Sequence, residues 1–139
     1  MSTKQNKKIL RDAFEKYNKG DVEALYEIIA PDHIAHTTGG VDIKGLDAFR
    51  ELDKLTRTTT PDGQYTIDDI IAEGDKVAWR QTLRGTFTGK FKDVAPTGNK
   101  IEVQANIIHR FANGKIVETW AVRDMLTMLQ QMGIIPPMK

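Results

Sequence analysis

The amino-acid sequence predicts an α+β fold in which a curved, cone-shaped antiparallel sheet wraps around N-terminal helices. Apolar residues recur at helical spacing in the first 57 residues, whereas polar and apolar residues alternate between Tyr65 and Asp124. Asn113-Gly114 adds a strong signal for a tight turn within that second region. Helices gathered before a run of antiparallel strands are typical of this class. Such a sheet leaves an open mouth where small molecules commonly bind.

Two helices are predicted at the start of the chain. Residues 4–18 carry apolar side chains at helical spacing, and Gly20 tolerates the left-handed conformation that ends a helix. Asp21 can cap a second, short helix, whose apolar residues extend to Ile29. We expect Pro31 to end this helix, because the residue before a proline is disfavoured in the helical region.

A short strand and a third helix come next. The strand is predicted over His33–Thr37 and closed by Gly39-Gly40. Apolar spacing predicts the helix over residues 45–57, and the composition of residues 58–63 is that of a loop.

Four long strands and a closing helix complete the predicted order. The helix covers Met125–Met132 and ends at Gly133. The strands are expected at Tyr65–Glu73, Lys76–Thr88, Lys100–Phe111 and Lys115–Arg123.

Composition narrows the classes of function. The 139 residues suit one domain, taken here as residues 1–139, and 20 Lys+Arg against 19 Asp+Glu argue against nucleic-acid or membrane-surface binding through bulk charge. The absence of cysteine excludes disulfides and thiolate catalysis. No apolar run reaches the length of a membrane span, and no apolar signal region follows the first residues. We therefore expect a soluble cytoplasmic protein.

Asp124 is the strongest candidate for chemistry, because it closes a long apolar strand. In one hypothesis its carboxylate lies in an apolar pocket, where desolvation would raise its pKa and make it a useful acid or base. In the other it caps the helix that begins at Met125. A carboxylate bonded to backbone N–H groups would have a lowered pKa and be a weaker base.

Further candidates have simpler alternatives. His109 shares the apolar face of its strand and is either a pocket residue or a core histidine, and His36 is either a pocket residue or a surface residue at a strand end. Trp120 could stack on a flat ligand or fill the core. Arg80 falls on the polar face of its strand and is either an outer-face or dimer-interface residue or a pocket residue, and Tyr17 ends an apolar helix stripe, either at a pocket mouth or at the edge of the core.

A metal site is not predicted. His33 and His36 are three residues apart on a strand and so point to opposite faces, which disfavours shared coordination.

Several segments together resemble the SnoaL-like polyketide cyclase family, also known as predicted ester cyclases. The resemblance runs from about Ala13 to Gly133 and depends on the order and spacing of short motifs. These motifs are Asn18-Lys-Gly-Asp21, Ala30-Pro-Asp32 with His36, Gly85-Thr86 with Gly89, Ala95-Pro-Thr-Gly98, Arg110 to Trp120 with Asp124, and Gln131-Met-Gly133.

The resemblance implies a fold similar to nuclear transport factor 2, with an apolar pocket inside a cone. It implies that Asp124 is the catalytic acid/base and that His36 and His109 line the pocket. Many members also carry an arginine at the position of Arg80. Where many members read Gly-Thr-His, this chain has Phe87, so a substrate contact made by that histidine would be missing.

The expected function is aldol-type cyclisation of a polyketide-like ester without a cofactor. Asp124 would take a proton from an activated carbon, and the enolate would attack another carbonyl. The alternatives are a non-catalytic small-molecule-binding protein and a hydrolase or isomerase of the epoxide hydrolase or ketosteroid isomerase kind on this fold. The expected partners are a hydrophobic small-molecule ligand and a second copy of the chain in a homodimer.

Overall fold

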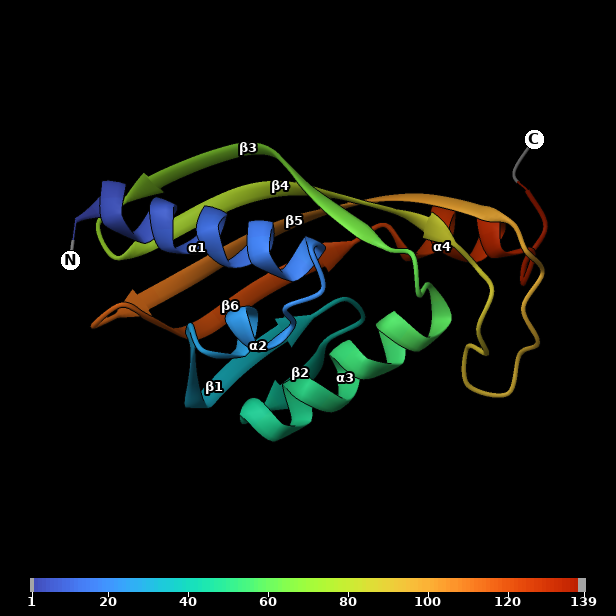
Figure 1. Ribbon diagram of the computed structural model, residues 1–139, viewed down its shortest axis with the longest axis horizontal. Helices are drawn as coiled ribbons and strands as arrows, with labels where there is room; N and C mark the ends of the chain where they lie inside the picture. The colour runs from blue at the N-terminus through green and yellow to red at the C-terminus, as the bar shows by residue number, and fades with distance from the viewer. Residues whose placement is uncertain (1, 138–139) are drawn as a thin grey trace.

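A single six-stranded sheet curves around three helices in the computed structural model, which describes residues 2–137. Figure 1 shows α1, α2 and α3 on one face of this sheet, and α4 beside its far end. The predicted α+β class is confirmed. In chain order the elements are α1 (Thr3–Asn18), α2 (Glu23–Tyr26), β1 (Ile29–Thr37), β2 (Val41–Lys44), α3 (Leu46–Thr59), β3 (Gln64–Glu73), β4 (Lys76–Thr86), β5 (Lys100–Ala112), β6 (Lys115–Arg123) and α4 (Met125–Met132).

The sheet order is β2-β1-β6-β5-β4-β3. All neighbours pair antiparallel except β1 and β6, which run parallel. This parallel pair brings a strand from the first third of the chain beside the last strand, so residues far apart in sequence share one pocket wall.

The predicted second helix is too long. Strand β1 begins at Ile29 and continues through Pro31, where a helix end was expected. The β1–β6 pairing is irregular between Ile29 and Ile34, so the missing N–H group of Pro31 falls where no regular ladder exists. Strand β2 was not predicted, because in the sequence Gly39-Gly40 indicates only the end of a strand. Both glycines have positive φ, and they turn the chain back so that β2 pairs with β1 in a short hairpin.

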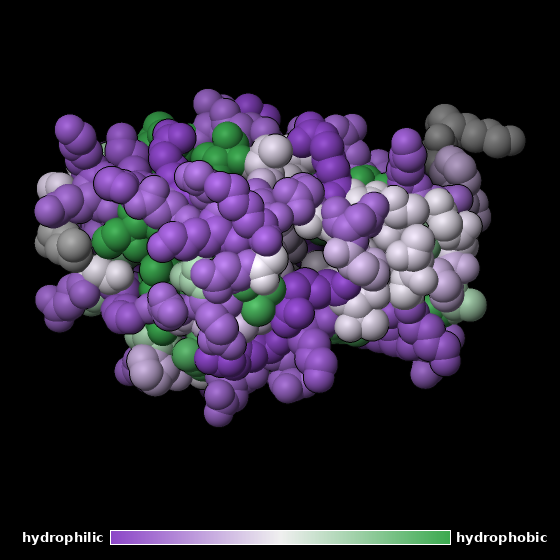
Figure 2. All heavy atoms as spheres, in the orientation of Figure 1, coloured by the Kyte–Doolittle hydropathy of each residue, from purple (hydrophilic) through white to green (hydrophobic). Residues whose placement is uncertain are grey.

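Apolar side chains form two cores. The larger lies between α1 and the concave, or inner, face of the sheet, and it includes Leu10, Phe14, Val77 and Trp79. The smaller lies under α4, with Phe87, Ile101, Val103 and Met132 all at most 3% exposed. None of the helices among residues 2–137 is long and apolar enough to cross a membrane. The surface view in Figure 2 is mainly hydrophilic, with scattered hydrophobic side chains.

A bulge in β6 decides which of its residues face inward. Arg110 pairs with Glu118 and Phe111 pairs with Ile116, so Val117 is an extra residue without a partner. The alternation of β6 reverses at this point. Ile116 is buried, but the inward positions beyond the bulge are Thr119, Ala121 and Arg123, while Glu118, Trp120 and Val122 face outward.

Candidate functional site

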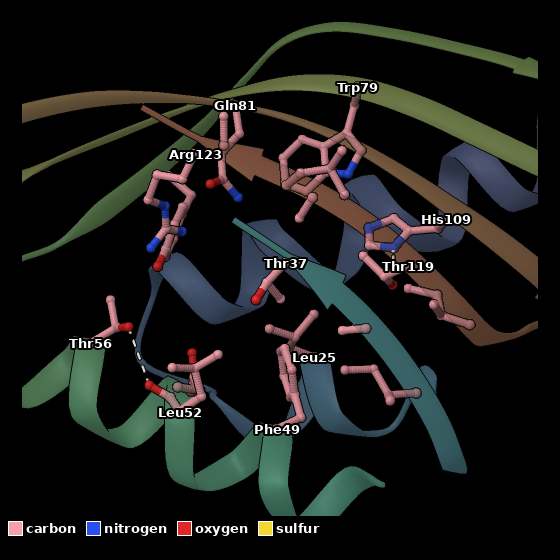
Figure 3. Close-up of a pocket in the computed structure, with 18 of the residues that line it drawn as sticks. Leu25, Thr37, Phe49, Leu52, Thr56, Trp79, Gln81, His109, Thr119 and Arg123 are labelled. Carbon is pink, nitrogen blue, oxygen red and sulfur yellow. Dashed lines mark hydrogen bonds between the residues drawn. The ribbon is translucent and has the colours of Figure 1, made fainter. Parts of the chain in front are cut away.

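An apolar pocket of about 300 Å³ lies between the inner face of the sheet and the helices. Figure 3 shows side chains from β4, β5 and β6 on one side of this cavity and from α2 and α3 on the other. Most of the wall is aliphatic or aromatic, including Leu25, Phe49 and Trp79. Thr37, Thr38, Thr56 and Tyr65 add hydroxyls to this wall, and its other polar groups fall into three sets.

The first set joins two histidines through one hydroxyl. Thr119 Oγ1 lies 2.8 Å from His33 Nε2 and 2.8 Å from His109 Nδ1. The three residues come from β1, β6 and β5, adjacent strands of the sheet, and each is at most 8% exposed. The parallel pairing of β1 with β6 and the bulge at Val117 bring these inward positions together.

Both imidazoles are held neutral by their surroundings. Burial lowers the pKa of His33 to about 4 and that of His109 to about 3. Near neutral pH each ring therefore has one N–H donor and one lone-pair acceptor.

The second set consists of buried polar atoms that have no hydrogen-bond partner among the described residues. Four such atoms belong to pocket-lining side chains: His33 Nδ1, Trp79 Nε1, Gln81 Oε1 and His109 Nε2. Leaving such an atom unpaired costs on the order of 1–3 kcal/mol. All four atoms are buried, so a ligand with matching polar groups would recover that free energy once its binding moves the side chains that cover them.

The third set carries charge. Arg123 lies on the pocket wall, and Figure 3 shows its guanidinium beside Gln81; it forms no ion pair within residues 2–137. The Asp53 carboxylate also lines the pocket, but it is already satisfied. It accepts bonds from the hydroxyls of Tyr17 (2.7 Å) and Tyr26 (2.5 Å) and from Arg57 Nε (3.0 Å). Arg123 is therefore the charge available to a ligand, and Asp53 is a structural anchor.

Residues 7–132 match the family model of the SnoaL-like polyketide cyclases. The chain belongs to the SnoaL-like polyketide cyclase family. No curated protein gave a significant match.

Solved structures of several proteins are similar to this chain over nearly its whole length. IdmH from Streptomyces antibioticus, a candidate polyketide cyclase, is 34% identical, with 93% of this chain and 99% of IdmH covered and a TM-score of 0.81. AclR from Streptomyces galilaeus, a candidate hydroxylase, is 28% identical, with 99% and 87% covered and a TM-score of 0.89. An NTF2-like protein of unknown function from Burkholderia pseudomallei is 19% identical, with 95% and 98% covered and a TM-score of 0.76, which shows the fold alone.

Asp124 does not lie in the pocket, where it was expected. Its exposed carboxylate caps α4, accepting bonds from Thr127 N (3.1 Å) and Thr127 Oγ1 (2.7 Å), and it is absent from the pocket wall. These bonds lower its pKa, the Thr127 hydroxyl contributing most. The helix-cap hypothesis is confirmed, and the expected raised pKa is wrong. The physical reason is the bulge, which turns Asp124 to the parity of outward residues.

His36 and Trp120 lie on the convex, or outer, face of the sheet and not in the pocket. Their rings stack with centroids 5.6 Å apart. His36 Nε2 lies 2.8 Å from Glu118 and Nδ1 lies 2.9 Å from Asp42, and these bonds raise its pKa. The expected pocket roles of both residues are wrong, because on β1 the inward parity belongs to His33 and on β6 the bulge turns Trp120 outward.

Of the remaining candidates, one lines the pocket and the others lie outside its wall. His109 lines the pocket as expected. Arg80 lies on the outer face and pairs with Asp69 at 2.9 Å, which agrees with its place on the polar side of the strand and corrects the pocket role proposed for it. Tyr17 is buried and reaches the site only through its bond to Asp53, so it is not a direct pocket residue. Phe87 lies fully buried in the core under α4, so its difference from the family motif leaves the pocket wall unchanged.

Sequence reasoning missed several residues that the pocket brings together. Gln81 shares parity with Trp79 and Leu83 on β4, and His33 shares parity with Ala35 and Thr37 on β1, so alternation alone could have found both. Thr119 and Arg123 carry no such signal, because the bulge cannot be read from the sequence. Among residues 2–137, no cluster of three or more His, Asp or Glu side chains has the arrangement to hold a metal ion.

Proposed function

We propose that this chain is a cofactor-independent enzyme that closes a ring in a hydrophobic, polyketide-like ester by an aldol-type reaction inside the cone. The observation that carries the proposal is the set of four unpartnered polar atoms on a mainly apolar pocket wall. A purely apolar ligand would leave all four unpaired, whereas a chain of carbonyl and enol groups supplies both acceptors and donors. Membership in the SnoaL-like family supports the same class of substrate.

The proposed roles follow from position. His33 and His109 exchange protons with the substrate, because their free ring nitrogens are the titratable groups on the wall that lack partners. The guanidinium of Arg123, which forms no ion pair among the described residues, stabilises a developing enolate or alkoxide oxygen. The nearby Gln81 orients a hydroxyl or enol group through its carbonyl oxygen. The enolate carbon then attacks a second carbonyl carbon, and the resulting alkoxide takes up a proton.

A synthetic polyketide-like ester tests this proposal. In methyl 3,5,7-trioxo-7-phenylheptanoate, attack of C2 on C7 closes a six-membered ring, and loss of water gives an aromatic product that absorbs in the ultraviolet. We expect the wild-type chain to accelerate its formation, measured by liquid chromatography and mass spectrometry. His109→Asn should slow the reaction by about 10²-fold, the usual contribution of a positioned proton-transfer group.

His36→Asn is the matched control, since the same change on the outer face should leave the rate unchanged. Equal rates with and without protein would overturn the proposal. A His36→Asn variant as slow as His109→Asn would overturn the assignment of the pocket as the site.

A second candidate, a non-catalytic small-molecule-binding protein, is favoured by one observation: the carboxylate of Asp124 caps α4 outside the pocket. Its signature would be quenching of Trp79 fluorescence by the same ester at micromolar concentration without any conversion. Trp120→Phe removes the only other tryptophan of the sequence from this measurement.

The homodimer expected from the sequence also remains a proposal. It is supported by exposed apolar side chains on the sheet, namely Ile71, Ile108, Trp120 and Val122. Light scattering at micromolar concentration should give twice the mass of 15.6 kDa, and a monomer mass would contradict it.

A further inference from the structure

The hydroxyl of Thr119 imposes a constraint on the two histidines that it joins. A hydroxyl has one proton and two lone pairs, so accepting from both nitrogens would leave its own proton without a partner unless a third group accepts it. Thr119 Oγ1 has no other hydrogen-bond partner among the described residues, so its proton is paired only when it donates to one nitrogen and accepts from the other. With both contacts at 2.8 Å, one of His33 Nε2 and His109 Nδ1 therefore carries a proton and the other carries a lone pair.

Two arrangements satisfy this constraint when both rings are neutral. In the first, His33 Nε2–H donates to Thr119 and the threonine hydroxyl donates to His109 Nδ1, so His109 carries its proton on Nε2. In the second, all three protons are shifted: His109 Nδ1–H donates to Thr119, the hydroxyl donates to His33 Nε2, and His33 carries its proton on Nδ1. Both rings thus always share the same tautomer, either both Nε2–H or both Nδ1–H.

The free nitrogens of the pair are consequently opposite in character. In the first arrangement His109 Nε2 is a donor and His33 Nδ1 is an acceptor; in the second the roles are exchanged. Neither nitrogen has a partner among the described residues, and both side chains line the pocket. The wall therefore offers one donor and one acceptor that can only change places together.

The burial of the two rings favours an exchange in which neither ring becomes charged. Burial lowers the pKa of both histidines, so a proton added to one ring makes an imidazolium that the pocket disfavours. His109 would be a weak base if it had to keep that proton. It loses this disadvantage if a second proton leaves at the far end of the chain of bonds as the first one arrives.

We propose that His33, Thr119 and His109 form a neutral proton relay that moves a proton from a carbon to a carbonyl oxygen of the substrate without creating a charged ring. This inference rests on the proposed function and deepens it by naming the substrate class: a compound with an acidic C–H bond next to a carbonyl group.

The bonds balance in the forward step. Starting from the second arrangement, the substrate C–H bond breaks and its proton bonds to His109 Nε2. The Nδ1 proton of His109 passes to Thr119 Oγ1, whose own proton passes to His33 Nε2. The Nδ1 proton of His33 bonds to the substrate carbonyl oxygen. The products are the enol and the first arrangement of the relay, and the reverse step restores the second.

The relay can be tested on enolisation alone, separately from ring closure. The probe is 1-phenylbutane-1,3-dione, whose keto–enol relaxation is followed by its ultraviolet absorption. Thr119→Val keeps the size of the side chain but removes the hydroxyl, and Thr119→Ser restores a hydroxyl. We expect the rate to fall by about 10²-fold in Thr119→Val and to stay within a few-fold of wild type in Thr119→Ser.

Two readouts separate a relay from a merely structural threonine. In mixtures of H₂O and D₂O, the wild-type rate should fall along a curve, because several exchangeable protons move together, whereas the residual Thr119→Val rate should fall along a straight line. Nitrogen-15 NMR of the ligand-free protein should show His33 and His109 in the same tautomer in wild type and Thr119→Ser, and this match should be lost in Thr119→Val.

The outcomes are distinguishable. Acceleration that survives in Thr119→Val, or opposite tautomers in the wild type, would overturn the relay and leave the proposed function standing. No acceleration by the wild-type protein would overturn both. Acceleration of enolisation with no closure of the triketo ester would overturn the proposed ring-forming function and retain the relay.

Discussion

The two faces of the sheet use the same residue types for opposite purposes. On the inner face, His33 and His109 are nearly fully buried, share one hydroxyl and have lowered pKa values. On the outer face, His36 lies between two carboxylates, and its pKa is raised. His33 and His36 are three positions apart on one strand, so desolvation and neighbouring charge, rather than residue type, decide the chemistry of each ring.

Arginines and carboxylates follow the same division. On the outer face, Arg80 pairs with Asp69 and Arg110 pairs with Glu118, so their charges are compensated in solvent. At the pocket that the inner face lines, Arg123 of β6 has no such pair in the described chain, and Asp53 of α3 is enclosed by donors. The outer face is thus internally balanced, whereas the inner face has charge and polar groups left over for a ligand.

The largest difference in stability between the pocket and the outer face should come from substituting one carboxylate in each, Asp53 and Asp69. Asp53→Asn removes a buried charge that three donors surround, and we expect a loss of about 3 kcal/mol in the free energy of unfolding. Asp69→Asn on the outer face should cost less than about 0.5 kcal/mol, because its ion pair with Arg80 is exposed. Urea unfolding of both variants measures the difference, and similar costs would remove the energetic distinction between the pocket and the outer face.

The free energy of unfolding should depend on pH through the two buried histidines. Each should contribute a loss of about 2 kcal/mol as the pH decreases from 7.5 to 5. In the unfolded chain a histidine titrates near pH 6.5, whereas folded His33 and His109 titrate near pH 4 and pH 3. The unfolded state therefore binds more protons between these values, and stability falls as the pH decreases from 7.5 to 5. Carboxylates with lowered pKa values lose their contribution mainly below this window, in the range where they would protonate when unfolded.

Substituting one histidine on each face shows how much each contributes to the change in the free energy of unfolding with pH. His109→Gln should flatten the loss between pH 7.5 and 5 by about half, since one of two buried rings is gone. His36→Gln should steepen it, because the raised pKa of His36 contributes stability that is present at low pH and lost as the pH rises. Urea unfolding at several pH values gives both slopes. An unchanged slope in His109→Gln would contradict the prediction that His109 is buried in its neutral form.

Much of the fold could be predicted from the sequence because its signals are local. The apolar alternation of β5 predicts an inward face, and every inward residue from Ile101 to Phe111 is at most 9% exposed. Asn113, at φ 51, forms the predicted turn with Gly114. The error at Pro31 also has a local cause, since the rule that ended the helix is equally satisfied by a strand.

The site was harder to predict because it depends on features that are not local. One unpaired residue, Val117, turns Trp120 and Asp124 outward and Thr119 and Arg123 inward. Simple alternation, counted from Ile116, gives the opposite result. The parallel pairing of β1 with β6 then decides that His33 meets Thr119, which no spacing within either strand could reveal.

Asp124 gives the smallest expected effect and the most direct challenge to the comparison. Asp124→Ala should destabilise the protein by about 1 kcal/mol through loss of the helix cap, whereas Asp124→Asn keeps an acceptor for Thr127 N and should stay within about 0.5 kcal/mol of wild type. Because the carboxylate lies outside the pocket, Asp124→Asn should also retain conversion of the triketo ester within a few-fold. If it abolished conversion while the fold survived, an exposed, solvated carboxylate would be the essential acid or base, and the buried histidines would lose their place in the reaction. A single pair of variants thus decides whether the chemistry of this chain belongs to the inner face or to the strand end that the bulge turns away from it.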